Sequence, residues 1–326
     1  NPPYAESGDT LGSEAKTAVA STKVANGMKD YGYATRELFV QFLVRIAQEI
    51  PRATVAMFST LKYVNASNFE KFRDAWHAKY LGGFVVHSKA FDGLSGNFPI
   101  GFLVWATDQS KNKQAITEIT TDVLDKKALA VGEKSFYNIP SQKLLSNWIV
   151  RPRANKVEVI PLKNAVTPAT ASKDIRGTRW ADDAIGCLVI KGPDIQNAST
   201  QALLSSGYGS AGTFFVTRKN LWQSGVLFAV RRVIKQTWLN NRDQFLQPTG
   251  ELTEEFKTDC LLWMLFNGSN LTASANDLEW GGKKWSIVNH FIPFTEAEVN
   301  APDRFESDFM VQYLADKTLS QEAKSV

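Results

Sequence analysis

Cysteine, histidine and long apolar segments are scarce in this sequence, and each shortage excludes a class of protein. The two cysteines among 326 residues, Cys187 and Cys260, both stand inside short apolar runs. That setting favours buried free thiols over a disulfide framework. The two cysteines and three histidines also lack the spacing of metal ligands. We therefore expect no metal site and a location in the reducing cytoplasm.

Long apolar runs are missing as well. The longest, around residues 261–266, is far shorter than the roughly 20 residues that span a bilayer as a helix. The chain opens with a polar turn, which is not the start of a signal peptide. We expect no membrane partner. The initiator methionine is also missing and residues 322–326 fit the interior of a helix, so we expect the chain to be a piece of a longer protein.

The overall composition indicates a folded protein with a mildly basic surface. Apolar residues make up 44% of the chain and charged residues 21%, which is enough for a core and argues against disorder. The length allows two domains. The formal net charge of +4 fits a polyanionic partner without requiring one.

The first elements predicted from the sequence are a loop and a helix. Residues 5–34 are rich in Gly, Ser, Thr, Ala and Lys and predict a long loop, which has room for a short helical piece. Disorder of this segment is the alternative. Apolar side chains at helical spacing then predict an amphipathic helix over 35–50. Thr35 is the expected cap of this helix, and Pro51 is expected to end it.

Strands and a second helix complete the first 110 residues. A buried strand is predicted at 54–58, and Ser67 with Glu70 forms a predicted capping box for the next helix. Two more strands are predicted at 83–88 and 100–105, with a connection too long for a tight hairpin. This order predicts the second half of an α/β sheet that ends in an antiparallel strand.

Beyond residue 110 the pattern is irregular and indicates an α+β region. Strands are predicted at 116–124, where a helix is the alternative, and at 156–160, 185–190 and 213–216. Helices are predicted at about 225–238 and 253–266.

Asn1-Pro2-Pro3-Tyr4 is the motif that points to chemistry. Methylation of an exocyclic amine needs a nitrogen lone pair that is not delocalised into the ring. The Asn1 side-chain oxygen and the Pro2 carbonyl can accept the two amine hydrogens and favour that form. The prolines keep the turn rigid, and Tyr4 offers a flat face for an extruded base. A plain surface turn is the alternative, and these four residues alone do not decide between the two.

The residues downstream favour the chemical interpretation. The tetrapeptide, the helical segment 37–43, the strand 55–58 and the segment 82–105 together resemble the γ-type N6-adenine DNA methyltransferases of restriction–modification systems. The resemblance covers residues 1–110. It implies the C-terminal part of a Rossmann-like, S-adenosylmethionine-dependent methyltransferase sheet. Residues 111–326 would then be the target-recognition region, a match that rests mainly on position.

The resemblance also implies the residues of the site. Asn1, Pro2, Pro3 and Tyr4 would be catalytic, and Tyr4 would stack on one face of a flipped adenine. The family has an aromatic residue for the other face in the loop before the last strand, and Phe91 matches it best. Phe98 is the alternative, although its neighbours Pro99 and Ile100 favour simple packing at the sheet edge. Phe91, flanked by polar residues, fits stacking better.

The expected cofactor is S-adenosylmethionine. In the family, its Gly-rich turn precedes Asn-Pro-Pro-Tyr, and this sequence begins at Asn1. The Gly-rich stretch 207–212 lacks the strand–turn–helix setting of a cofactor loop. We therefore expect residues upstream of Asn1 to bind most of the cofactor, and the chain alone to be inactive.

Basic residues in the second half predict contact with DNA. They are interleaved with tryptophans, each of which fits a core position better than a DNA contact. Basic side chains can neutralise phosphates, although solvated surface charge is the alternative. The predicted DNA-binding set is Arg151, Arg153, Arg218, Lys219, Arg231, Arg232 and Lys235.

The function expected from these observations is methylation of adenine N6 in double-stranded DNA by a site-specific, adenine-specific enzyme. One alternative is the methyltransferase part of a fused restriction–modification enzyme, for which these residues contain no nuclease signature. Another is a non-catalytic DNA-binding or specificity subunit, and a methyltransferase acting on protein or RNA is the last. A separate specificity or restriction subunit is a conceivable partner.

Overall fold

The computed structural model describes residues 18–50, 52–107, 116–138, 143–158, 178–209, 212–267 and 274–325. The chain folds into two units, Asn1–Gln142 with Gln236–Gln244 and Lys143–Lys235 with Phe245–Val326. The boundary predicted from the sequence, between the catalytic part and the target-recognition region, lies at residue 110. It does not coincide with this structural division, because two strands beyond residue 110 belong to the first unit's sheet.

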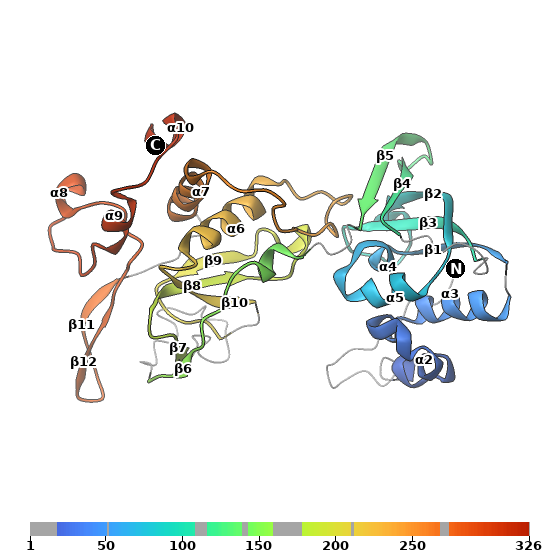
Figure 1. Ribbon diagram of the computed structural model, residues 1–326, viewed down its shortest axis with the longest axis horizontal. Helices are drawn as coiled ribbons and strands as arrows, with labels where there is room; N and C mark the ends of the chain where they lie inside the picture. The colour runs from blue at the N-terminus through green and yellow to red at the C-terminus, as the bar shows by residue number, and fades with distance from the viewer. Residues whose placement is uncertain are drawn as a thin grey trace. The chain divides into compact units, whose positions relative to one another are not determined.

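Five of the described strands form the mixed sheet of the first unit (Figure 1). In spatial order they are β1 (Thr54–Thr60), β3 (Pro99–Ala106), β2 (Lys79–His87), β4 (Glu118–Leu124) and β5 (Ala130–Tyr137). β3 is antiparallel to both β1 and β2, so β1 and β2 run parallel to each other. β4 is parallel to β2 and antiparallel to β5. The first unit is thus mixed α/β, and β3 confirms the antiparallel strand predicted at 100–105.

Helices pack on one face of this sheet (Figure 1). The helices that pack there are α3 (Leu38–Glu49), α4 (Lys62–Asn65) and α5 (Glu70–Ala75), with the 3-10 turn η3 (Ser67–Phe69) between the last two. They are preceded by η1 (Ala18–Ser21), α2 (Lys23–Gly27) and η2 (Lys29–Arg36). The apolar spacing of residues 38–46 therefore produced the predicted helix. The short helical piece predicted within residues 5–34 is present, and it is longer than expected because η1, α2 and η2 follow one another.

Both predicted helix caps of the first unit are wrong. Thr35 lies inside η2, and its hydroxyl donates to the Gly32 carbonyl at 3.0 Å. Helix α3 instead begins after Glu37, which is buried and forms an ion pair of 2.7 Å with Lys62. The expected box at Ser67 does not form, because η3 occupies that position and α5 has no side-chain cap.

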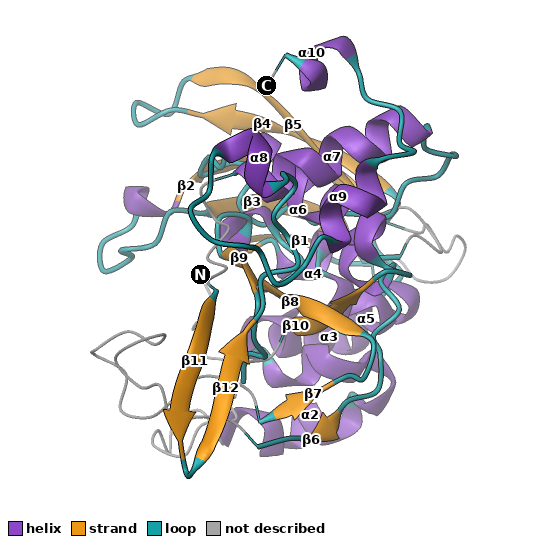
Figure 2. Cartoon of the chain, turned by 90° about the vertical axis from the view of Figure 1, so that its left-hand side faces the viewer, coloured by secondary structure: helices purple, strands orange, loops and turns teal. Residues whose placement is uncertain are grey.

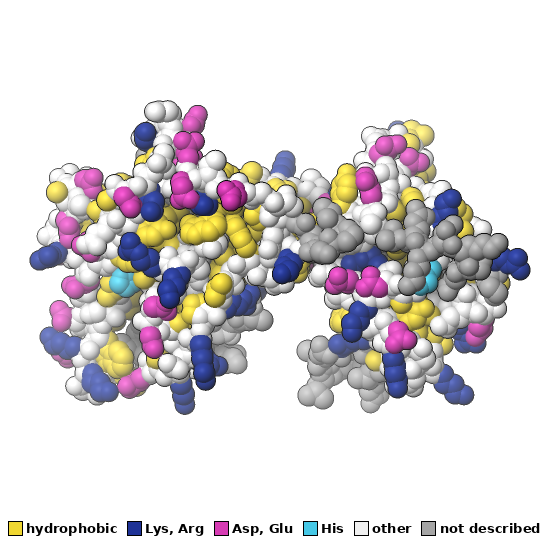
Figure 3. Space-filling view, in the orientation of Figure 1, with side chains coloured by type: hydrophobic (Ala, Val, Ile, Leu, Met, Phe, Trp, Pro, Cys, Tyr) yellow, Lys and Arg dark blue, Asp and Glu magenta, His cyan; other side chains and the backbone are white. Residues whose placement is uncertain are grey.

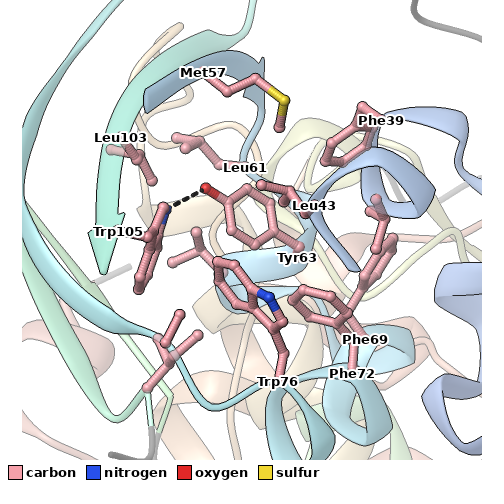
Figure 4. Packing of buried hydrophobic residues seen from close by; sticks show 14 of the residues in the cluster. Phe39, Leu43, Met57, Leu61, Tyr63, Phe69, Phe72, Trp76, Leu103 and Trp105 are labelled. Carbon is pink, nitrogen blue, oxygen red and sulfur yellow. Dashed lines mark hydrogen bonds between the residues drawn. The ribbon is translucent and has the colours of Figure 1, made fainter. Parts of the chain in front are cut away.

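Aromatic side chains dominate the core between helices and sheet (Figure 4). Phe69, Phe72 and Trp76, predicted to face inward, are fully buried. The indole N–H of Trp105 donates to the Tyr63 hydroxyl at 3.0 Å. This bond satisfies the buried indole N–H, and burial raises the pKa of the Tyr63 phenol.

The second unit is α+β. Its sheet has the order β10 (Thr213–Thr217), β8 (Ala184–Ile190), β9 (Gln201–Leu204) and is antiparallel throughout. Helices α6 (Leu221–Val233) and α7 (Glu254–Phe266) share its core. The predicted strands at 185–190 and 213–216 are confirmed. The helix predicted at 225–238 ends at Val233, which leaves Trp238 outside it.

Small elements complete the second unit. One short ladder pairs β6 (Asn155–Lys156) with β7 (Arg179–Trp180), and the hairpin β11 (Ala275–Trp280) with β12 (Lys283–Ile287) stands apart from the three-stranded sheet (Figure 2). Three short helices follow the hairpin, namely α8 (Glu296–Val299), α9 (Phe309–Leu314) and α10 (Gln321–Lys324). Met310 of α9 is fully buried in the core of this unit.

Candidate functional site

The predicted catalytic residues Asn1, Pro2, Pro3 and Tyr4 lie outside the described residues, so their role stays a prediction. The structure does describe the loop that was predicted to hold the second stacking residue. This loop, residues 88–98, connects β2 to β3 and starts with the 3-10 turn η4 (Ser88–Ala90).

Ser88 closes the base of the loop. Its backbone N–H donates to the Phe98 carbonyl at 2.9 Å. Its hydroxyl donates to the Gly96 carbonyl at 2.6 Å and accepts from the Phe98 N–H at 3.4 Å. Ser88 is fully buried, so water does not compete for these bonds. The loop is therefore tied at its base, and residues 92–95 at its tip are exposed.

His87 and Asn97 form a second set of hydrogen bonds across the base of the loop. The Nδ1 atom of His87 accepts the Lys89 backbone N–H at 3.0 Å. Because Nδ1 is an acceptor, the ring proton of the neutral imidazole sits on Nε2. Nε2 then donates to the Asn97 side-chain oxygen at 2.8 Å. Both nitrogens of His87 are thus used in holding the loop.

Phe91 lies against a cluster of phenylalanines on the sheet. Met57, Val85 and Leu103 are buried on the helix side, so alternation along the strands places Phe58, Phe84 and Phe102 on the opposite face. There Phe58 lies 4.8 Å from Phe102 and 5.2 Å from Phe91, ring centre to ring centre. Phe91 meets Phe58 at 74° and is half-buried, so it keeps some exposed surface.

Phe98 has a different environment. Its ring is half-buried, and the guanidinium of Arg242 lies 5.6 Å from its centre. Its backbone makes both of the bonds to Ser88 described above. Phe98 therefore packs at the base of the loop, whereas Phe91 lies closer to the tip.

Sequence reasoning missed the segment 236–244, which belongs to the first unit. Trp238 packs on His87 with ring centres 5.2 Å apart, and the Asn241 amide donates to the Asn97 carbonyl. Asp243 forms an ion pair with Lys134 of β5. Burial raises the pKa of the Asp243 carboxyl, and Lys134 opposes that rise. The polar run 240–243 after Trp238 was the only signal of this role in the sequence.

The structure corrects the predicted DNA-binding set at Arg231. This side chain is 2% exposed. Its guanidinium donates to the carbonyls of Lys191, Gly192 and Asn197 at 2.8–2.9 Å. Burial lowers the pKa of the Arg231 guanidinium, while Asp194 raises it. Arg231 therefore holds the backbone of its own unit and is not a surface residue.

The other basic residues of the set fall into two groups. Arg218 and Lys219 are exposed in the turn before α6, whereas Arg232 and Lys235 belong to its other end. Because α6 has 13 residues, about 20 Å separates the two groups. On the face in Figure 3, Lys and Arg side chains are scattered among acidic ones rather than gathered in one patch.

A buried asparagine brings two more of these residues to the first group. Asn220 is 3% exposed, and its amide donates to the carbonyls of Val150 at 3.1 Å and Phe215 at 3.0 Å. Its oxygen accepts the Thr217 N–H at 2.9 Å. The exposed Arg151 and Arg153 directly follow Val150. These bonds place the 150–153 segment beside the turn that carries Arg218 and Lys219, a group we call the basic turn.

Comparisons with known proteins add nothing to these observations. No protein-family model, no curated protein and no solved structure matches the chain. Within the described ranges, no cluster of three or more His, Cys, Asp or Glu side chains could hold a metal ion. No helix among the described residues has the length and apolar character needed to cross a membrane.

Proposed function

We propose that this chain is part of a DNA adenine-N6 methyltransferase. The observation that carries the proposal is the order of elements after the Asn-Pro-Pro-Tyr motif. A helix, a strand, short helices and a second strand are followed by an antiparallel strand between the two parallel ones. The resemblance of residues 1–110 to the γ-type enzymes predicts this order of elements, with a stacking loop before the last strand.

The loop 88–98 supports the proposal by its construction. A residue that stacks on a flipped base must be presented on an ordered loop, because ordering it at each turnover would cost conformational entropy. Ser88 and His87 fix the base of this loop. Phe91 is held against Phe58 and is still half-exposed. In the proposed site, Phe91 contacts the face of the adenine opposite Tyr4.

The roles at the reacting amine follow from the motif. The Asn1 side-chain oxygen and the Pro2 carbonyl accept the hydrogens of N6 and keep its lone pair available. S-adenosylmethionine would supply the methyl group and leave as S-adenosylhomocysteine, and the extra proton of the amine would then pass to water. A tuned general base among the chain's own residues is therefore unnecessary.

The Gly-rich stretch 207–212 does not fit the cofactor turn. It connects β9 to β10, so a strand follows it where a phosphate- or nucleoside-binding turn needs a helix N-terminus. Residues preceding Asn1 are therefore the proposed main site of S-adenosylmethionine, as the resemblance implies.

The second unit fits the proposed recognition role through the basic turn. Arg151, Arg153, Arg218 and Lys219 are exposed next to the start of α6, where they can neutralise phosphates.

The direct test is product analysis with the full-length protein. Mixed-sequence duplex DNA and methyl-labelled S-adenosylmethionine are incubated with the protein, and the digested nucleosides are separated. The proposal expects label in N6-methyladenine. Label in cytosine products, or in RNA or protein offered in parallel but not in DNA, would overturn it.

A further inference from the structure

We propose that residues 236–244 position the loop 88–98 for base stacking, with Trp238 and Asn241 as the positioning residues. This inference rests on the proposed function. It adds a role for a segment that lies far from the loop in sequence and that carries none of the predicted site residues.

The contacts of the segment gather at the base of the loop. Asn241 is 3% exposed and donates to the Asn97 carbonyl. The side chain of the same Asn97 accepts from His87, on which Trp238 packs. Arg242 covers the ring of Phe98. The segment therefore contacts residues from both sets of hydrogen bonds that close the base of the loop. None of its described contacts is with Phe91 itself.

The segment is ordered by its own turn. The Thr237 N–H donates to the Asn240 side-chain oxygen at 2.8 Å, and the Asn240 N–H donates to the Thr237 hydroxyl at 3.3 Å. The Asp243 N–H donates to the Asn240 carbonyl at 2.9 Å. These bonds hold residues 237–243 in turns without a helix or strand, so the backbone that carries Trp238 and Asn241 is ordered.

Both ends of the segment continue into well-anchored parts of the second unit. Upstream lies α6, whose Arg231 donates hydrogen bonds to three backbone carbonyls. Downstream, the Phe245 N–H donates to the Pro193 carbonyl at 2.9 Å, and the Phe245 carbonyl accepts from Leu145 at 2.8 Å. The segment is thus continuous along the chain with the second unit at both ends, and it meets the base of the loop through the contacts of Trp238 and Asn241.

The test uses four variants of the full-length protein. Asn241→Ala removes the bond to Asn97, and Trp238→Ala removes the packing on His87. Trp238→Phe keeps an aromatic ring there and should restore function. Gln236→Ala is the matched control, because Gln236 is an exposed residue of the same segment.

Three readouts separate positioning from general stability. Hydrogen exchange at the Ser88, Phe91 and Phe98 amides should quicken in the two disruptive variants while global unfolding is unchanged. Because a misplaced group costs up to about a hundredfold in rate, kcat for methyl transfer should fall by about ten- to a hundredfold. The Kd for duplex DNA should stay within about twofold, since the phosphate contacts remain.

The outcomes also separate this inference from the proposed function. Unchanged loop exchange and unchanged kcat in Asn241→Ala and Trp238→Ala would overturn the positioning role. A parallel loss of kcat, DNA affinity and melting temperature would also overturn it, because it would show simple destabilisation. If the wild-type protein transfers no methyl group, the proposed function fails, and the exchange experiment still decides whether the segment orders the loop.

Discussion

At the scale of single residues, two phenylalanines of one loop have different surroundings. Phe91 lies against Phe58 towards the exposed tip, whereas Phe98 lies at the base under Arg242. Their sequence neighbours already pointed the same way, because Phe91 is followed by Asp92 and Gly93 and Phe98 by Pro99 and Ile100. Their contacts support Phe91 as the stacking residue and Phe98 as a packing residue.

Phe91→Ala should therefore lower kcat or base extrusion by about one to two orders of magnitude, because one base–aromatic stack is worth roughly 1–3 kcal/mol. Phe98→Ala should lower the melting temperature more than it changes extrusion. Steady-state kinetics on one cognate duplex with a fluorescent base analogue measure both effects. The opposite pattern, with Phe91→Ala silent and Phe98→Ala inactive, would reverse the assignment.

Neighbouring arginines on α6 also differ. Arg231→Ala should reduce the free energy of unfolding by about 3–5 kcal/mol, because buried carbonyls lose charged donors. Arg232→Ala should cost about 1 kcal/mol or less, since its bond to the Asn267 oxygen is long at 3.4 Å and the side chain is half-exposed. Denaturant unfolding measures both. Equal losses in the two variants would contradict the buried role of Arg231.

At the scale of elements, the close approach of α6 to α7 depends on Gly225, which has no side chain. A Cβ atom at Gly225 would lie 2.8 Å from the Cα atom and 2.9 Å from the nitrogen of Leu261. Both are backbone atoms, so only a shift of a whole helix could relieve the clash. Gly225 is buried on α6, which places this contact in the centre of the helix pair.

Gly225→Ala should destabilise the second unit by about 1–3 kcal/mol, as overpacked cores do. Gly27→Ala is the control, because nothing lies within 4 Å of its added Cβ atom, and it should be neutral or slightly stabilising. Calorimetric unfolding of both variants tests the difference. A Gly225→Ala variant as stable as the wild type would show that α6 and α7 pack less closely.

Elements with a strong periodic pattern were predictable, and their caps were not. The apolar spacing of residues 38–46 located α3 within a few residues. Thr35 failed as a cap because Gly32 adopts a positive φ of 62° inside η2, and the Thr35 hydroxyl turns back to the Gly32 carbonyl. Local signals of this kind are weaker than tertiary packing, which decides where the first turn begins.

The contacts at the candidate site were also only partly predictable from the sequence. The burial of Arg231 was predictable in principle, since Leu227 and Phe228 precede it by four and three residues on the apolar face of α6. The contacts of Trp238 and Asn241 with the loop 88–98 were not predictable, because they join residues about 150 positions apart and follow no periodic pattern.

At the scale of the whole molecule, the two units divide the proposed tasks. The first holds the elements that follow the Asn-Pro-Pro-Tyr motif, and the second holds the basic turn. The chain passes between the units after residues 142, 235 and 244. Recognition and chemistry are thus proposed to belong to different units, which the chain joins at three points.

The basic turn should bind duplex DNA in a strongly salt-dependent manner. Arg218→Gln with Lys219→Gln should reduce the slope of log Kobs against log salt by about 1.8, since each lost phosphate contact removes about 0.9. Lys126→Gln with Lys127→Gln is the charge-matched control, because both lysines are exposed in the β4–β5 turn of the first unit. Equal effects of the two pairs would show non-specific attraction, and no effect of the first pair would remove the recognition role of the basic turn.

The most direct test of the methyltransferase proposal is the rate of N6-methyladenine formation by full-length wild-type protein and its Asn1→Ala variant on one duplex. The Asn1 oxygen is needed during transfer, so its loss acts on the transition state. The rate should fall by at least about a hundredfold, as it does when a single transition-state hydrogen bond is lost. Tyr4→Ala should lower it less completely, because it removes stacking alone. A wild-type rate in a folded Asn1→Ala variant would contradict the methyltransferase proposal.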